Sequence, residues 1–214
     1  RVGHGDTILL ESCEYCDSFL NFFPTLAVIL NVEADHLDYF KDLQDVQKSF
    51  RMFAQLATDG ILANGDDPHV TQTLEGIDYV SFGLSDANRI YAKNISGDWR
   101  HFDVICDGEF YCHLDLQVIG KHNVLNALAA AGAAWYLHIP GMAVAAGLAA
   151  FTGADRRMQY KGEINGAKLY DDYAHHPDEL SATIDAVRTM GFKRLVIAFQ
   201  PHTYTRTKTL LDDF

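Results

Sequence analysis

The chain has 214 residues, with 17 basic and 29 acidic side chains and a net charge of −12 when histidines are neutral. Because 48% of the residues are hydrophobic and 21% are charged, the chain can bury a substantial core and is not a disordered tail. The acidity argues against a nucleic-acid coat protein or a surface drawn to anionic lipid, since phosphate contacts need clustered lysines and arginines. The sequence contains no apolar run near the roughly 18 residues of a membrane span and no signal-peptide pattern at its start. We therefore expect a soluble, cytoplasmic enzyme or binding domain.

The cysteines and the chain ends allow predictions about the state of the thiols and about the extent of the protein. Cys13 and Cys16 have the spacing at which two thiolates share a zinc ion or form a redox pair, but Cys106 and Cys112 follow with irregular spacing. Reduced thiols of a cytoplasmic protein are therefore the favoured interpretation. The chain begins with Arg1 rather than Met and ends within an amphipathic pattern, so we expect a piece of a longer protein.

In the first half of the chain, apolar runs predict an α/β sheet. A glycine-containing segment at 3–7 is predicted to be a turn, because a phosphate-binding loop needs Lys and Ser/Thr after its glycines. Strands are predicted at 8–10, 26–30, 60–63, 78–82, 89–95, 102–106 and 110–116. We expect 26–30 to be a central parallel strand and the last three to form an antiparallel meander. Helical spacing predicts a helix over 44–57.

The second half begins with two predicted helices and then changes in composition. The helices are expected at 120–137, which is rich in alanine, and at 140–151. The composition shifts near residue 152, so we divide the chain into domains 1–151 and 152–214. The elements expected in the second domain are a hairpin (159–163 and 168–172), a helix (177–190) and a buried strand (194–199).

Polar side chains gather where the first two predicted strands end. Glu11 follows the run 8–10, where acidic residues of nucleotide-hydrolysing sheets hold magnesium, although a merely solvated glutamate is the alternative. After the next strand, Asp35, His36 and Asp38 could bind a metal, act as acid and base, or start a helix with a capping carboxylate. These residues alone leave both interpretations open.

Two later segments place hydrogen-bonding groups beside predicted helix starts. His122, Asn123 and Asn126 lie on neighbouring turns, where they could contact a base edge or a ribose, with helix capping by Asn123 as the alternative. The run 171–177 combines paired carboxylates and paired imidazoles after a strand. Such groups are costly there unless they are solvated or used, which favours a functional site.

Cations gather in two short segments of this acidic chain. Arg206 and Lys208 follow the last predicted strand, and Arg156 and Arg157 lie at the domain boundary. These side chains suit a carboxylate or a phosphate, with a solvated basic turn as the alternative.

Taken together and in this order, these segments resemble the Mur amino-acid ligases. The resemblance covers essentially the whole chain and rests on six runs, at 11–15, 31–38, 120–126, 153–157, 171–177 and 199–207. Any one run is a modest signal, whereas six in one order are highly specific. The last two are most similar to those of the family member that joins L-alanine to UDP-N-acetylmuramate.

The resemblance implies a three-domain parent protein. Its domains bind a UDP-sugar, bind ATP on a mainly parallel central sheet, and form a Rossmann-like C-terminal unit. This chain would hold the later part of the central domain and the start of the third. The family's phosphate loop lies upstream of the segment that begins here, so we expect no ligase turnover from this chain alone. Sites split across two domains also imply closure on substrate binding, with a hinge near Gly153.

The resemblance further implies a reaction and a cofactor. ATP would phosphorylate the carboxylate of UDP-N-acetylmuramate, and the amine of L-alanine would attack the acyl phosphate to form an amide, in cytoplasmic peptidoglycan precursor synthesis. Magnesium, with Glu11 and His36 as ligands, would offset the charge on the reacting groups.

The remaining site residues are implied in the same way. The residues implied for ATP are His122, Asn123, Asn126, Arg157 and Asp172. The residues implied for L-alanine are Tyr173, His202 and Arg206, with Arg206 pairing with its carboxylate. The implied catalytic residues are His36, Arg157 and His175.

Two rival interpretations remain open. A ligase that recycles murein tripeptide would share the ATP chemistry and differ around residues 202–206. A non-catalytic nucleotide-binding module is the rival from a different class. In none of these interpretations is a nucleic acid or a membrane an expected partner.

Overall fold

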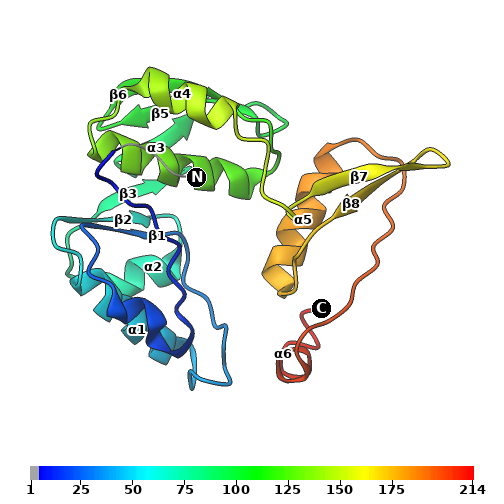
Figure 1. Ribbon diagram of the computed structural model, residues 1–214, viewed down its shortest axis with the longest axis horizontal. Coiled ribbons are helices and arrows are strands. Elements are labelled where there is room, and N and C mark those ends of the chain that lie inside the picture. Colours follow the sequence, from blue (N-terminus) through cyan, green and yellow to red (C-terminus); the bar gives the residue numbers. More distant parts are fainter. Residues whose placement is uncertain (1–4) are drawn as a thin grey trace.

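Two α/β units follow one another along the chain in the computed structural model, which describes residues 5–214 (Figure 1). The turn predicted at 3–7 begins in residues 1–4, which lie outside the described residues. The strands of the first unit are β1 (Leu26–Ile29), β2 (Gly60–Asn64), β3 (Val80–Gly83), β4 (Ile90–Lys93), β5 (His101–Cys106) and β6 (Glu109–Asp115). The second unit contains the hairpin of β7 (Gln159–Ile164) and β8 (Ala167–Asp171).

The six strands of the first unit lie side by side in the order in which they occur in the chain. The pairings from β1 to β4 are parallel, whereas β4 with β5 and β5 with β6 are antiparallel. The predicted mainly parallel sheet and the predicted meander are thereby confirmed. Because parallel strands end at the same edge of a sheet, the segments after β1, β2 and β3 emerge together.

Helices cover both faces of this sheet (Figure 1). On one face lie the 3-10 helix η1 (Tyr15–Asn21), α1 (Leu43–Gln55) and α2 (Pro68–Thr73), and on the other lie α3 (Lys121–Tyr136) and α4 (Gly141–Ala149). The helices predicted at 44–57, 120–137 and 140–151 correspond to α1, α3 and α4. Within residues 5–214, no helix has both the length and the apolar character needed to cross a bilayer.

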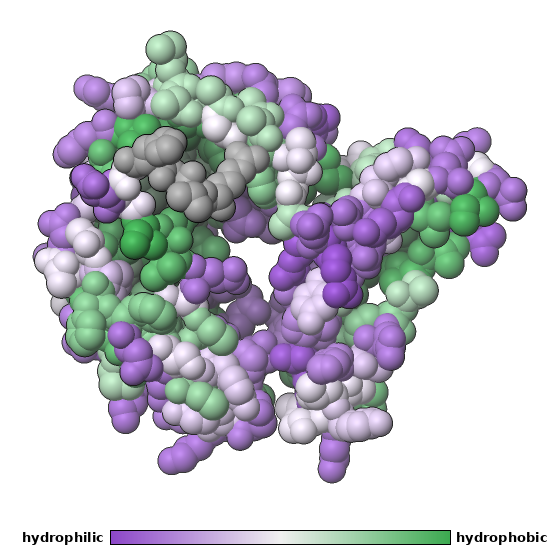
Figure 2. Space-filling model, viewed as in Figure 1, coloured by the Kyte–Doolittle hydropathy of each residue, from purple (hydrophilic) through white to green (hydrophobic). Residues whose placement is uncertain are grey.

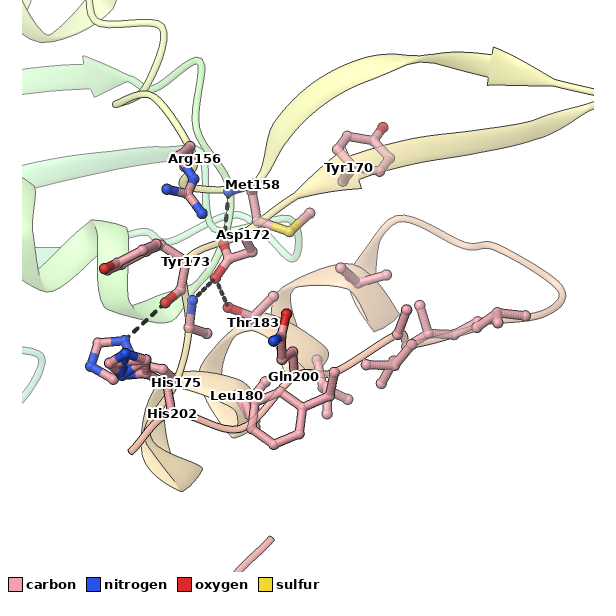
Figure 3. Close-up of a pocket in the computed structure, with 18 of the residues that line it drawn as sticks. Arg156, Met158, Tyr170, Asp172, Tyr173, His175, Leu180, Thr183, Gln200 and His202 are labelled. Carbon is pink, nitrogen blue, oxygen red and sulfur yellow. Dashed lines mark hydrogen bonds between the residues drawn. The ribbon is translucent and has the colours of Figure 1, made fainter. Parts of the chain in front are cut away.

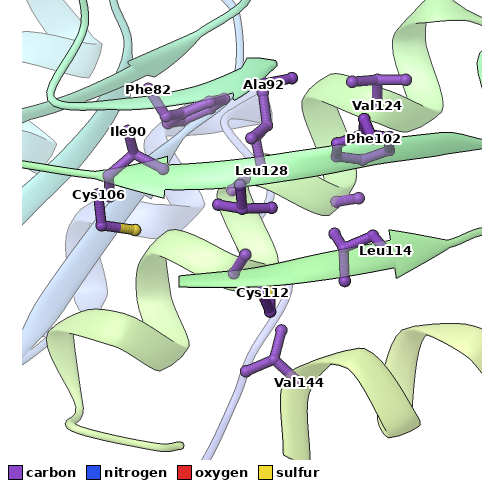
Figure 4. Packing of buried hydrophobic residues seen from close by; sticks show 14 of the residues in the cluster. Phe82, Ile90, Ala92, Phe102, Cys106, Cys112, Leu114, Val124, Leu128 and Val144 are labelled. Carbon is purple, nitrogen blue, oxygen red and sulfur yellow. The ribbon is translucent and has the colours of Figure 1, made fainter. Parts of the chain in front are cut away.

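Alternating side chains of β2 contribute to two separate cores. Leu62 packs toward α3, whereas Ile61 and Ala63 belong to the cluster under α1, because successive strand residues point to opposite faces. The larger core joins the sheet to α3 and α4, and its fully buried members include Phe102 and Leu128 (Figure 4). These two cores hold the parallel strand ends in fixed positions.

The second unit consists of the hairpin, α5 (Pro177–Thr189) and α6 (Tyr204–Thr209). Asn165 and Gly166 form the hairpin turn with positive φ angles of 50° and 82°, as this dipeptide predicts. α5 begins with Pro177 and a capping box in which the side chain of His176 and that of Glu179 each accept a backbone N–H. The hairpin and the helix at 177–190 are confirmed.

Three strand predictions are wrong. Residues 8–10 and 194–199 are not strands, and their apolar side chains are largely exposed. β1 is an edge strand that pairs only with β2 among the described residues, not a central one. A strand needs hydrogen bonds to a neighbouring strand, and neither 8–10 nor 194–199 pairs with one in the described part of the chain, so both runs stay irregular. The short helices η1, α2 and α6 were not predicted.

Candidate functional site

A cavity of about 1490 Å³ opens between the loop that follows β1 and the second unit. Asp35, His36 and Asp38 line it from the first unit, and its lining from the second unit includes Tyr173 and Arg206. Hydrophilic surface gathers on both sides of the opening between the units (Figure 2). The cavity therefore lies beside the loop that follows the carboxyl end of β1, the end of a parallel strand at which open α/β sheets bind their ligands.

The two units are joined across this cavity by an ion pair. Nη2 of Arg206 donates to Oδ1 of Asp35 at 2.8 Å, and Nη1 of Arg206 donates to the carbonyl of His202 at 2.9 Å. The Arg206 side chain is only 14% exposed, and its Nε is buried without a hydrogen-bond partner. Burial favours a raised pKa for Asp35, but the hydrogen bond and charge of Arg206 outweigh it, and the pKa of Asp35 is lowered. Arg206 therefore binds a carboxylate of the first unit, and one of its buried nitrogens keeps an unused donor.

His36 occupies a tight turn at the mouth of the same cavity. Its backbone has a positive φ of 54°, and its N–H donates to Oδ1 of Asp35 at 2.7 Å. Its ring lies 4.7 Å from that of Tyr15, and its Nε2 is 3.4 Å from a carboxylate oxygen of Glu14. The turn directs the imidazole toward carboxylates rather than into the core.

The predicted magnesium ligands can be placed on this geometry. Glu11 is exposed, upstream of Glu14, and carboxylates of Glu14 and Asp35 lie within 4.0 Å of the His36 imidazole. Oxygen ligands of this kind suit magnesium. Within residues 5–214, however, neither Glu11 nor His36 belongs to a group of three clustered metal-ligating side chains. The pair remains a prediction.

Asp172, the predicted ribose ligand, organises the loop between β8 and α5 (Figure 3). Its Oδ2 accepts from the N–H of Met158 at 2.8 Å, and its Oδ1 accepts from the N–H of Ala174 at 2.9 Å and from the hydroxyl of Thr183 at 3.3 Å. This carboxylate therefore joins the entry of the hairpin to α5. Its position in the cavity lining leaves it facing any ligand there.

Tyr173, His175 and His202 also line the cavity. The guanidinium of Arg156 lies 4.6 Å from the centre of the Tyr173 ring, a cation–π contact. Nδ1 of His175 lies 3.0 Å from the carbonyl oxygen of Tyr173 and 3.3 Å from Oε2 of Glu179, so Nδ1 carries the proton. Nε2 of His175 is then the nitrogen that can accept a proton. His202 is exposed.

Glu179 is a site residue that the sequence reasoning missed. Its Oε1 accepts from Nη1 of Arg157 at 3.1 Å, and its Oε2 accepts from the N–H groups of His175 and His176 at 2.9 and 3.3 Å. Burial favours a raised pKa, but these donors outweigh it and the pKa of Glu179 is lowered. The spacing of a capping box, with Glu three residues after the N-cap, was the signal that could have identified it.

The start of α3 packs against α5 and brings the predicted nucleotide ligands together. Gly120 approaches α5 so closely that a Cβ added to it would lie 2.9 Å from Cβ of Ala186. Burial lowers the pKa of His122. The negative charge of Asp172 acts against this shift, whereas the positive charge of Arg157 lowers the pKa further. These three predicted ATP ligands therefore lie close enough to interact, although they come from two units.

The neighbouring asparagines are arranged differently from each other. Nδ2 of Asn123 donates to the carbonyl of Ile119 at 2.7 Å and lies 3.1 Å from Nε2 of His122, so it orders the helix entry. The N-cap itself is Gly120, which has no side chain to offer. Asn126 is exposed one turn further along.

Apart from Glu11, Asn123 and Asn126, the predicted site residues fall into two groups. His36, Asp172, Tyr173, His175, His202 and Arg206 line the large cavity. Electrostatic contacts connect His122 with Arg157 and Asp172 at the junction of α3 and α5. Asp172 belongs to both groups. Asp35, the partner of Arg206, was noted only as part of a polar run, because no local pattern indicates a contact between residues 171 positions apart.

Two domain families match this chain in the order that the structure shows. The Mur ligase middle domain matches residues 10–134, and the Mur ligase glutamate ligase domain matches residues 156–214. The chain belongs to the Mur ligase family.

Within the family, the chain is similar to UDP-N-acetylmuramate–L-alanine ligases. It is 42% identical over 221 residues to that of Caldanaerobacter subterraneus subsp. tengcongensis and 43% identical over 220 residues to that of Clostridium novyi. Both alignments include 100% of this chain and 48% of the relative. The chain therefore spans about half the length of the curated relatives that it matches.

Solved structures show the same likeness. UDP-N-acetylmuramate-alanine ligase MurC of Thermotoga maritima aligns with a TM-score of 0.73 and 26% identity over 91% of this chain and 45% of its own. A murein peptide ligase of Psychrobacter arcticus aligns with a TM-score of 0.63 and 28% identity over 83% of this chain and 37% of its own. MurF of Acinetobacter baumannii, at 20% identity over 80% of this chain and 39% of its own, shares the fold with a TM-score of 0.71.

Proposed function

We propose that this chain is part of an ATP-dependent ligase that joins L-alanine to UDP-N-acetylmuramate in cytoplasmic peptidoglycan precursor synthesis. The similarity to ligases of that name along the whole chain supports the substrates. The observation that carries the proposal is the cavity in which His36 of the first unit faces Tyr173, His202 and Arg206 of the second. A ligase must bring an activated acid and an amine together in one such enclosed space.

The amino-acid end of the proposed site rests on Arg206. Its guanidinium already binds the carboxylate of Asp35 at 2.8 Å, in an environment that leaves one of its nitrogens without a partner. The carboxylate of L-alanine is of the same chemical type and would use the same receptor. Tyr173 and His202 would enclose the small side chain and the ammonium group.

The nucleotide end rests on the junction of α3 and α5. Asn126 and His122 would contact the adenine, Asp172 the ribose, and Arg157 the phosphates. Burial lowers the pKa of His122, so this imidazole is neutral and can accept or donate a hydrogen bond. Arg157 is held by Glu179 at 3.1 Å, which positions its charge while part of the side chain stays exposed.

The reaction that this site would perform has two steps. The carboxylate of UDP-N-acetylmuramate attacks the γ-phosphorus of ATP, which forms an acyl phosphate and releases ADP. The amine of L-alanine then attacks the carbonyl carbon of the acyl phosphate, which forms the amide and releases phosphate. Magnesium bound by Glu11 and His36 would offset negative charge on the reacting groups. Nε2 of His175 is the candidate acceptor for the proton that the attacking amine loses.

The direct test uses the full-length protein and measures phosphate release. We expect release only when ATP, UDP-N-acetylmuramate and L-alanine are all present, with alanine preferred over glycine and serine. Arg206→Ala should raise the alanine KM by about tenfold or more, because a charge-assisted hydrogen bond is worth about 1.5–3 kcal/mol. Arg188→Ala, which removes an exposed arginine of α5 that does not line the cavity, is the matched control and should leave this KM unchanged.

A murein tripeptide ligase is the second candidate, supported by the likeness to the Psychrobacter arcticus structure. It would release phosphate with the tripeptide and not with free alanine. That result, or an unchanged alanine KM in Arg206→Ala, would contradict the assignment of the amino-acid site.

A further inference from the structure

A cluster of histidines and aspartates lies on β5 and β6, away from the proposed ligase site. In the antiparallel register His101 faces Asp115, and Asp103 faces His113, so the four side chains share one surface of the sheet. His101, His113 and Asp115 are exposed. Their neighbours along the strands, Phe102 and Leu114, point the other way into the core.

Three of these side chains already have nearly the spacing of metal ligands. Nδ1 of His101 lies 2.6 Å from Oδ1 of Asp115, and Nε2 of His113 lies 3.5 Å from the same oxygen. All three ligand atoms lie within 4.8 Å of one another. In a tetrahedral zinc site with bonds of about 2.0–2.1 Å, ligand atoms are about 3.3 Å apart. The hydrogen bond between His101 and Asp115 has to open, and the nitrogens of His101 and His113 have to settle at the same spacing, which side chains that are about half exposed can do.

A second layer of hydrogen bonds orients His113. Its Nδ1 lies 2.7 Å from Oδ1 of Asp103, and Oδ2 of Asp103 accepts from Nδ2 of Asn94 at 2.7 Å. A proton on Nδ1 leaves the lone pair of Nε2 directed toward Asp115. This carboxylate–histidine arrangement is the one that orients histidine ligands in metal sites and raises their basicity.

We propose that His101, His113 and Asp115 bind a divalent transition-metal ion of the zinc type, with Asp103 as the residue that positions His113. Two imidazoles and one carboxylate favour such an ion over magnesium, which prefers oxygen ligands. The three ligands leave one tetrahedral position to water. The proposal is independent of the ligase function, because all its residues lie on the outer surface of one antiparallel strand pair.

The test is a titration of the chain, without a histidine tag, with Co²⁺ followed by visible absorption and with Zn²⁺ followed by calorimetry. We expect one saturable site with the absorption of tetrahedral Co²⁺. His113→Ala should weaken binding by more than about 100-fold, and Asp103→Asn, which keeps all three ligands, by about 10–100-fold. Far-UV circular dichroism of each variant checks that the sheet is retained.

Asp178→Asn is the control variant. Asp178 belongs to a second group of metal-ligating side chains, with Glu33 and His176, at the junction of the units. Binding that survives this change supports the site on β5 and β6. Binding that Asp178→Asn abolishes, binding that His113→Ala leaves intact, or no saturable binding at all would overturn the proposal.

Discussion

Similar apolar runs form a buried strand in the first unit and an exposed irregular segment in the second. In the first unit the run 26–29 forms β1, pairs with β2 and buries Ala27 and Ile29 almost completely. In the second unit the run 194–199 is just as apolar, yet it forms no strand, and Leu195, Val196 and Ile197 are 43%, 74% and 52% exposed. The two runs differ in whether they pair with a neighbouring strand. β1 has a parallel partner and helices over its face, whereas 194–199 pairs with neither strand of the β7–β8 hairpin.

This contrast shows where the stability of the chain resides. Strand formation satisfies backbone groups only when a partner strand is present, and burial stabilises only when a helix covers the face. We therefore expect the first unit to behave as a cooperative core and the second to contribute little stability beyond α5 and its contact with α3.

The largest expected effect compares one substitution in the two units. Leu128→Ala removes a fully buried side chain of α3 and should lower the free energy of unfolding by about 2–5 kcal/mol. Leu195→Ala makes the same chemical change at a half-exposed position and should cost less than about 1 kcal/mol. Urea denaturation measures both. Equal losses would show that 194–199 is packed in solution.

The second prediction concerns the contact between the units. Gly120 has a φ of 101°, and an added Cβ would lie 2.9 Å from Cβ of Ala186. Gly120→Ala should cost about 1–3 kcal/mol through backbone strain and this close contact. Gly147→Ala in α4, where a Cβ meets nothing within 4 Å, should be neutral or stabilising by up to about 1 kcal/mol. Thermal unfolding distinguishes the two, and a neutral Gly120→Ala would contradict both the positive φ of Gly120 and its close contacts with His122 and Ala186.

The third prediction concerns the ion pair between Arg206 and Asp35, which crosses the cavity. Asp35→Asn removes the charge that Arg206 faces and should cost about 1 kcal/mol in urea denaturation, with an increase in the radius of gyration by X-ray scattering. Because the folded pKa of Asp35 is lowered, the same stabilisation should be lost in the wild type as the pH falls through that pKa. Asp185→Asn, which removes an exposed pair with Arg188, is the control. Identical scattering from both variants would contradict the bridge.

The smallest expected effect concerns the pH dependence of stability, to which His122 and His113 should contribute with opposite signs. Burial lowers the pKa of His122, so its contribution should favour folding above the unfolded pKa of about 6.5 and fade as the pH falls. The hydrogen bond to Asp103 raises the pKa of His113, so its contribution should be present at low pH and fade as the pH rises. Urea midpoints of His122→Gln and His113→Gln between about pH 5 and pH 8 should therefore differ from the wild type with opposite slopes. Parallel slopes would contradict these environments.

Much of the candidate site was predictable, because its residues stand in short runs next to strand ends and helix starts. His36, His175 and Arg206 stand in such runs, were selected because these runs resemble those of the Mur ligases, and all line the cavity. Glu179 was missed, and the partner of Asp35 was not predicted, for a physical reason: both residues act by binding other side chains, and the partner of Asp35 is 171 residues away. The strand at 194–199 was predicted wrongly because an apolar run specifies burial but not the partner that provides it.

Local sequence by itself determined the helices α1, α3 and α5, the hairpin turn at Asn165–Gly166 and the alternation that buries one side of β5 and β6. Periodicity, capping residues and turn dipeptides act over a few positions, so they can be recognised without a fold. Only the tertiary structure decided that β1 pairs with β2 alone within residues 5–214, that Arg206 binds Asp35, and that the start of α3 packs on α5. Those contacts join distant parts of the chain, and their free energy depends on burial and charge that exist only after the units come together.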